Sequence, residues 1–166
     1  MKIAIQDIPP EGLFFAFHGC DWLPGEVETV GEVQAELSLS RDRDRVLASG
    51  SFDLQIRQTC DRCLVDFILP LANSFKIDFE PETDEMSGRE HHCRPEEMDT
   101  EVLTGTEIDI HELLRQQFYL AMPVKVLCYG DCKGLCGGCG SNLNQAECSC
   151  QQETSSAFDV LRTLLK

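Results

Sequence analysis

Ten cysteines in a chain of 166 residues constrain the fold more than any other feature of this sequence. Reduced thiols at regular spacing bind metal ions, whereas oxidised thiols form disulfides, and the redox compartment decides between the two. The first ten residues, MKIAIQDIPP, contain an acid and two prolines where a secretory signal has a continuous apolar stretch. We therefore expect a cytoplasmic protein, without a membrane-spanning segment, whose cysteines bind metal.

The densest group of cysteines is a stretch near the C-terminus that contains six of them. In Cys136-Gly137-Gly138-Cys139, two residues between the thiols let both sulfurs reach one tetrahedral ion, and the glycines permit the tight turn. Later cysteines could close the same site after a chain reversal, for which Asn142 and Asn144 are suited. Because all-thiolate sites select zinc or iron and structural zinc sites have four protein ligands, we expect a zinc ion here. Its predicted ligands are Cys136, Cys139, Cys148 and Cys150.

A second pair with the same spacing, Cys60 and Cys63, lies where two predicted strands meet at a turn. A pair supplies only two of four ligands, and two cysteines of the late stretch remain to complete the set. The predicted second zinc site is Cys60, Cys63, Cys128 and Cys132, which gives two structural zinc ions in all. One site with spare thiols, an iron–sulfur cluster and a thioredoxin-like redox pair are the alternatives. The redox pair lacks the βαβ pattern that accompanies such motifs.

The other residues that could carry chemistry lack partners at useful spacing. Cys20 is interpreted as a small apolar residue, His111 as structural, and the stretch from His91 to Cys93 as part of a solvated loop. No combination of serine, histidine and aspartate, and no pair of carboxylates, rises above chance. We therefore expect no catalytic residue, no small-molecule substrate and no enzymatic activity.

The sequence carries a formal charge of −15, from 14 basic and 29 acidic residues. Such a charge repels the phosphate backbone of nucleic acids, which argues against non-specific binding of RNA or DNA. Residues 78–101 hold ten of the acids and only two arginines. We expect this stretch to be a solvated loop, with an acidic tether for a basic partner as the alternative.

Apolar and polar residues alternate with the period of a β-strand over much of the first half of the chain. The predicted strands are 33–39, 46–58, 64–71 and 74–79, with 2–8 and 13–17 as further candidates and a short extended run at 107–110. A helix is predicted from Asp109 to Met122, because Asp109 and Glu112 resemble a capping box, an apolar stripe follows, and Pro123 ends it. A last short helix is predicted over 158–166.

These elements predict an α+β fold, with a mainly antiparallel β body, one or two helices and a small C-terminal cysteine-rich zinc module. The predicted body covers residues 1–122 and includes the acidic loop, and the predicted module covers residues 123–166. The turn at Cys60 is expected close to the module, because its thiols are predicted to share a metal ion with it.

Four stretches, in this order along the chain, resemble the YceD-like family, whose members are also called large ribosomal RNA subunit accumulation proteins. They are CDRCLVDFILPL (60–71), EIDIHELLRQQFYLAMPVKVLC (107–128), CKGLCGGCGSNLN (132–144) and DVLRTLLK (159–166). The resemblance implies a role in the accumulation or processing of large-subunit (23S) ribosomal RNA, in bacteria or plastids, without an established catalytic activity. Members vary in their cysteines and some lack the late cluster, which points to a structural role for metal in this chain.

The favoured function is therefore a non-enzymatic zinc-binding factor in ribosome biogenesis, whose partners are ribosome assembly or rRNA-processing components, either protein or rRNA. A metal-dependent hydrolase or nuclease is one alternative, but a site with four thiolates offers neither an open coordination position nor a general base. A thiol-based redox or metal-sensing module is the other, and reversible thiol oxidation with metal release would support it.

Overall fold

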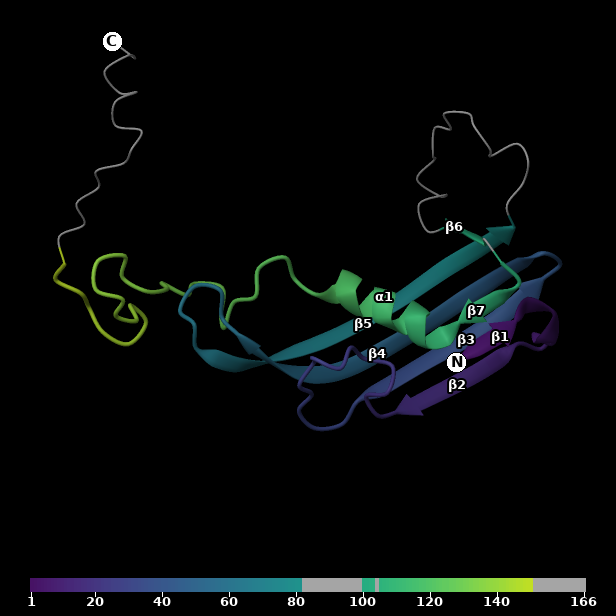
Figure 1. Cartoon of the computed structure of the whole chain (residues 1–166), viewed down its shortest axis with the longest axis horizontal. Coiled ribbons are helices and arrows are strands. Elements are labelled where there is room, and N and C mark those ends of the chain that lie inside the picture. The colour runs from purple at the N-terminus through teal and green to yellow at the C-terminus, as the bar shows by residue number, and fades with distance from the viewer. Residues whose placement is uncertain (82–99, 104, 151–166) are drawn as a thin grey trace, which may run out of the picture. The chain divides into compact units, whose positions relative to one another are not determined.

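The computed structural model describes residues 1–81, 100–103 and 105–150 (Figure 1). Within this part of the chain, no helix is long and apolar enough to cross a membrane. The elements in chain order are β1 (Lys2–Ala4), the 3-10 helix η1 (Ile5–Asp7), β2 (Leu13–His18), β3 (Gln34–Asp42), β4 (Arg45–Thr59), β5 (Asp66–Pro81), β6 (Thr100–Leu103), β7 (Glu107–Asp109) and α1 (Ile110–Ala121).

The chain forms two compact units. The first consists of Met1–Gln58 and Ile68–Val124, and the second of Thr59–Phe67 and Lys125–Lys166. The first unit contains the helix and most of each long strand. The second unit joins the turn between β4 and β5 to the cysteine-rich segment, so it is built from two stretches far apart in sequence.

Five strands form one sheet in the order β2-β3-β4-β5-β6. β3 is antiparallel to both β2 and β4, with Leu37 opposite Phe15 on one side and Gly50 on the other. β6 is parallel to β5 and pairs only with its last residues, Asp78 to Pro81. β1 and β7 form a separate antiparallel pair. The predicted α+β fold with a mainly antiparallel β body is confirmed, and β6 adds a parallel pairing that was not predicted.

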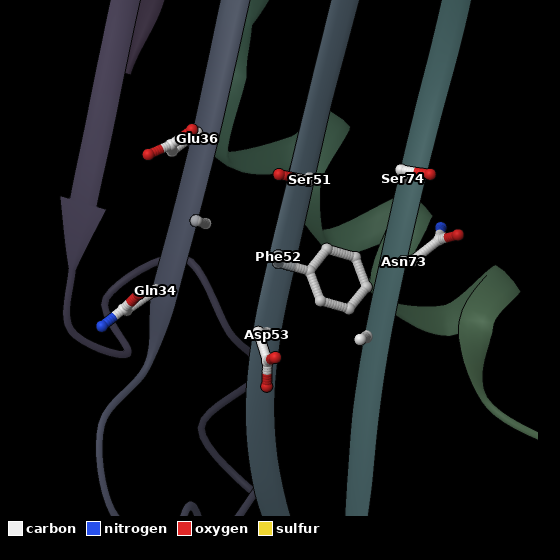
Figure 2. A pocket seen from close by; sticks show the side chains of 9 residues that line it. Gln34, Glu36, Ser51, Phe52, Asp53, Asn73 and Ser74 are labelled. Carbon is white, nitrogen blue, oxygen red and sulfur yellow. The ribbon is translucent and has the colours of Figure 1, made fainter.

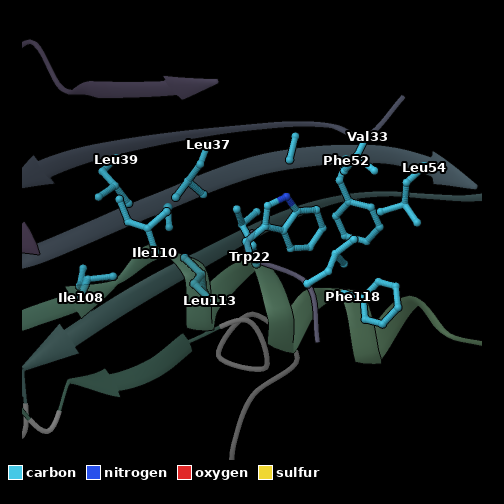
Figure 3. Packing of buried hydrophobic residues seen from close by; sticks show 14 of the residues in the cluster. Trp22, Val33, Leu37, Leu39, Phe52, Leu54, Ile108, Ile110, Leu113 and Phe118 are labelled. Atoms are coloured by element: carbon cyan, nitrogen blue, oxygen red, sulfur yellow. The ribbon is translucent and has the colours of Figure 1, made fainter. Parts of the chain in front are cut away.

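The core of the first unit lies between α1 and one face of the sheet (Figure 3). Burial alternates along β4, where Val46 and Ile56 are both fully buried, because successive side chains of a strand point to opposite faces. The apolar stripe of α1 packs against this face. The ring of Trp22 lies 5.7 Å from that of Phe52 and 6.5 Å from that of Phe118, and thereby joins a loop, the sheet and the helix.

The opposite face of the sheet is polar. Glu36, Ser51 and Ser74 lie on three neighbouring strands and line a hollow of about 490 Å³, with α1 behind the sheet (Figure 2). Asp53 adds a second carboxylate, and no basic residue lines the hollow. The hollow itself therefore offers no charge that would attract a phosphate.

The predicted helix is confirmed, with Ile110–Ala121 helical and Asp109 as its N-cap. The Asp109 carboxylate accepts hydrogen bonds from the backbone amides of His111 (3.1 Å) and Glu112 (3.3 Å), which have no acceptor inside the helix. The Glu112 carboxylate instead accepts a hydrogen bond from Arg115 at 2.7 Å. The cap therefore follows from Asp109, without the reciprocal bond that a full capping box requires.

The predicted boundaries of the strands 64–71 and 74–79 are wrong. β5 joins the two into one strand that runs without a break from Asp66, two residues after the predicted start, to Pro81. Pairing inside a sheet keeps the intervening residues extended, whatever their own preference. The candidate strand 2–8 divides into β1 and η1.

The two ends of the acidic stretch 78–101 are strands and not loop, because β5 extends to Pro81 and β6 begins at Thr100. Residues 82–99, which include His91, His92 and Cys93, lie outside the described residues, as does the predicted helix 158–166.

The interpretation of Cys20 as a small apolar residue is wrong, because its thiol is exposed. A turn closed by a hydrogen bond from the amide of Leu23 to the carbonyl of Cys20 (2.9 Å) buries the neighbouring Trp22. The larger indole fills the core, and the thiol is left at the surface.

Candidate metal centres

The first group of cysteines is built on the turn between β4 and β5. A hydrogen bond from the amide of Cys60 to the carbonyl of Val65 (3.0 Å) closes this turn. The turn places Cys60 and Cys63 beside Cys128 and Cys132, which follow α1 in the chain. The Sγ atoms of Cys60 and Cys132 are 3.8 Å apart, and those of Cys63 and Cys128 are 3.7 Å apart.

The four sulfurs of this first group match the size of a tetrahedral metal site. They all lie within 4.8 Å of one another. A zinc–thiolate bond of about 2.3 Å places the corners of a regular tetrahedron about 3.8 Å apart. Cys60, Cys63 and Cys132 are buried, and Phe67 and Leu127 pack against them. The group could therefore hold a metal ion that is shielded from water.

The two residues inside the early C-x2-C pair hold the two segments together. The amide of Asp61 donates to the carbonyl of Val126 (2.8 Å), and its carboxylate accepts from the amide of Val126 (2.7 Å). The Arg62 guanidinium donates to the carbonyl of Cys132 (2.8 Å), and the Arg62 carbonyl accepts from the amide of Leu135 (3.2 Å). The sequence pattern missed both residues, because the motif specifies its thiols and leaves the positions between them open.

The second group of cysteines, Cys136, Cys139, Cys148 and Cys150, lies within one continuous segment, and its sulfurs also fall within 4.8 Å of one another. The Sγ of Cys148 is 3.4 Å from those of both Cys136 and Cys139. The amide of Gly138 donates to the Sγ of Cys136 at 3.4 Å, which is the contact that a zinc knuckle makes. Cys139 and Cys150 are exposed, so this group is open to solvent where the first is not.

Asn144 lies between Cys139 and Cys148 in the sequence, and its side chain contacts the first group. Its side-chain amide donates to the Sγ of Cys132 (3.2 Å), and its side-chain oxygen accepts from the amide of Lys133 (2.7 Å). The backbone amide of Asn144 donates to the side-chain oxygen of Asn142 (2.9 Å). The sequence indicated these asparagines only as chain-reversal residues, because nothing local predicts a bond to sulfur. Contacts of this kind orient the ligands of a metal site.

Each group combines a readily ionised thiol with one that resists ionisation. Burial opposes ionisation of Cys60, but hydrogen bonds from backbone amides, with that of Cys128 first, lower its pKa to about 6. Burial and the neighbouring thiols raise the pKa of Cys128 to about 12. In the second group, the Ser141 hydroxyl lowers the pKa of Cys139 to about 6, whereas hydrogen bonding with the adjacent thiols raises that of Cys150 to about 12. Four thiolates this close repel one another unless a cation neutralises them.

The two groups could together hold two metal ions. Thiolate ligands favour soft or borderline ions such as zinc and iron. A tetrahedral ion with four protein ligands has no open position for water, and it therefore acts as a cross-link between chain segments. Apart from these eight cysteines, the described residues contain no cluster of three histidine, cysteine or acidic side chains at such spacing.

Comparison with known proteins places the chain in a family. Residues 48–165 match the family described as large ribosomal RNA subunit accumulation protein YceD, and the match covers more than half of the chain. The chain belongs to the YceD family. All eight cysteines of the two groups lie inside the segment that matches the YceD family.

Two relatives carry the same description. The chain is 40% identical over 47 residues to large ribosomal RNA subunit accumulation protein YCED homolog 1, chloroplastic, of Arabidopsis thaliana, across 28% of this chain and 15% of that protein. It is 34% identical over 61 residues to the protein of the same name from Zea mays, across 36% of this chain and 21% of that protein. The alignment with these YceD homologues thus spans only a small part of their length. No solved structure matches the chain.

Proposed function

We propose that this YceD family protein is a non-enzymatic, zinc-binding factor that supports the accumulation of large-subunit (23S) ribosomal RNA during ribosome biogenesis. The family description and the names of the plant relatives support a role in the accumulation of large-subunit ribosomal RNA. The observation that supports metal binding is that each of the two groups brings four sulfurs to the separation expected of a tetrahedral site. Zinc is favoured because closed sites with four protein ligands are typical of structural zinc.

The proposed role of zinc is structural. One ion would join Cys60 and Cys63 to Cys128 and Cys132, whose contacts span 65 to 72 residues of sequence. Because such a site does not exist in the unfolded chain, the free energy of metal binding becomes free energy of folding. Zinc would thus keep the cysteine-rich segment ordered for its partners.

The proposed partners are ribosome assembly or rRNA-processing components in the cytoplasm. The formal charge of −15 opposes extended contact with an RNA backbone, so any RNA contact would be local. Arg62 and Lys133 adjoin the cysteine ligands and are the candidates for such a contact. A basic protein partner would instead be attracted by the negative charge of the chain, so its contact need not be confined to these two residues.

The test is complementation of cells that lack the protein. We expect the wild type and the control Cys20→Ser to restore the ratio of 23S to 16S rRNA, and the double variant Cys60→Ser/Cys136→Ser to fail, because each site loses one ligand. The measurement is quantitative RNA analysis, with immunoblots to match protein abundance. An unchanged ratio of 23S to 16S rRNA in the cells that lack the protein would contradict the proposed role in rRNA accumulation. Full restoration by the double variant would contradict the zinc requirement.

A thiol-based sensor is a second candidate function, and the exposure of Cys139 and Cys150 favours it. Exposed thiolates react with oxidants sooner than buried ones. In a sensor, peroxide would release zinc from the second group, and a thiol reductant with added zinc would restore both the metal and the rRNA ratio. Zinc retention under peroxide would exclude this candidate.

A further inference from the structure

Within the part of the chain that the structure describes, one edge of β5 has no strand beside it over most of its length. β5 extends from Asp66 to Pro81, but β6 pairs only with its last four residues (Figure 1). Among the described residues, none pairs with this outer edge between Ile68 and Ile77. The backbone amides and carbonyls of an open edge can pair with another extended chain.

A hollow of about 500 Å³ follows this open edge. Five consecutive residues of β5, from Asn73 to Ile77, line it together with Thr100 and Glu101 of β6 and Gln117 and Leu120 of α1. Side chains of a strand alternate between faces, so five in a row place the hollow along the backbone edge itself. A strand edge with a helix beside it is the arrangement in which proteins bind extended peptides.

The helix contributes one continuous face to the groove. A second hollow of about 210 Å³ shares Glu101 with the first and is lined by Leu113 and Gln116 of α1. With Gln117 and Leu120 these residues occupy positions i, i+3, i+4 and i+7, which is one side of a helix. Leu120 is 76% exposed, so the groove presents an apolar side chain that a bound segment could cover.

The charge of the groove favours a cationic occupant. The hollow along the open edge is lined by Glu101 and Lys76, and the adjoining hollow adds the carboxylates of Glu107, Asp109 and Glu112 without a further lysine or arginine. Asp109 contacts the Met1 ammonium at 3.2 Å, and Glu112 pairs with Arg115 at 2.7 Å. The balance stays negative even with these two cations, and the whole chain carries −15.

We propose that the groove between α1 and the open edge of β5 binds an extended, lysine- or arginine-rich segment of a partner protein as an added strand. The edge supplies backbone hydrogen bonds, Leu120 contacts an apolar side chain, and the carboxylates attract the charge. The proposal rests on the proposed function only for the identity of the partner in the cell. A binding assay on the purified chain therefore separates its failure from that of the rRNA assay.

The assay is fluorescence anisotropy at near-physiological salt with three labelled seven-residue peptides. One alternates lysine with valine, one lysine with proline, and one glutamate with valine. We expect the lysine–valine peptide to bind about tenfold or more tightly than either other peptide. Proline keeps the charge but removes every second backbone amide and disfavours pairing as a strand, whereas glutamate keeps the strand propensity and reverses the charge.

Two variants with the same charge change locate the binding surface. Leu120→Arg should weaken the lysine–valine peptide about tenfold or more, whereas Phe14→Arg, at a residue 65% exposed on the opposite edge strand β2, should leave affinity within about twofold. Circular dichroism checks that both variants fold as the wild type does. Absent binding, equal binding of both lysine peptides, or equal weakening by both variants would overturn the proposal. So would self-association of the chain that Leu120→Arg abolishes in sedimentation, because the occupant would then be a second copy.

Discussion

Replacing Cys132 with serine should remove one metal ion and leave the other in place. The thiol is buried, lies 3.8 Å from that of Cys60 and accepts a hydrogen bond from Asn144. A serine hydroxyl stays protonated at neutral pH, so the first group would keep three thiolates. Structural zinc sites bind with about 10–16 kcal/mol, so an equal share for each of four ligands is about 2.5–4 kcal/mol. The variant should therefore bind zinc roughly 100- to 1,000-fold more weakly at this site.

The assay is zinc per chain by elemental analysis after dialysis against a competing chelator, together with limited trypsin digestion. We expect about two ions for the wild type and about one for Cys132→Ser. Cleavage after Lys133 should become faster, because the hydrogen bond from its amide to Asn144 (2.7 Å) depends on the folded site. The exposed Cys20 supplies a matched control, and Cys20→Ser should change neither readout. If Cys132→Ser keeps both ions as firmly as the wild type, Cys132 is not a ligand and the grouping is refuted.

Three further predictions concern thiol exposure, packing and pH. N-ethylmaleimide should modify the exposed Cys139 before the buried Cys60 when a chelator removes the metal. The order is measured by mass spectrometry at successive times, and the reverse order would contradict the greater solvent exposure of the second group. Gly50→Ala should destabilise the first unit by about 1–3 kcal/mol in denaturant unfolding, because a Cβ would lie 2.6 Å from a backbone oxygen of β3 and 2.8 Å from the ring of Phe75. Unchanged stability would show that the strands separate easily. Asp109→Ala should cost about 1 kcal/mol at pH 7 through loss of the N-cap. Partial burial opposes ionisation of Asp109, but backbone amide hydrogen bonds outweigh it and lower its pKa below the ordinary 3.8. The folded state thus binds fewer protons than the unfolded one, so the cap stabilises above pH 4 or so and its effect is lost as pH falls through the native pKa. The difference between wild type and variant should shrink on acidification, and a constant difference would refute this origin.

The local patterns of the sequence determined a large part of the fold. Alternation along β4 and the apolar stripe of α1 depend only on the repeat of the strand and of the helix, so they could be read without knowing any partner. The same holds for Asp109, whose carboxylate reaches amides only two and three residues away. The C-x2-C spacing likewise fixes which two sulfurs can approach one ion. Eight candidate ligands and a four-and-four division could therefore be predicted by spacing and counting.

Only the tertiary structure decided how these local units combine. The contacts of Cys60 with Cys132, and of Asp61 with Val126, join residues 65 or more positions apart, and no local pattern encodes such distances. The same limit explains why the parallel β6 and the uninterrupted β5 were missed, since pairing with a neighbour overrides the propensity of the residues between. Burial of the first cysteine group and exposure of the second also follow from packing. The C-x2-C spacing thus predicts cysteine ligands in both groups alike. The contacts around each group determine how far that group is exposed to water.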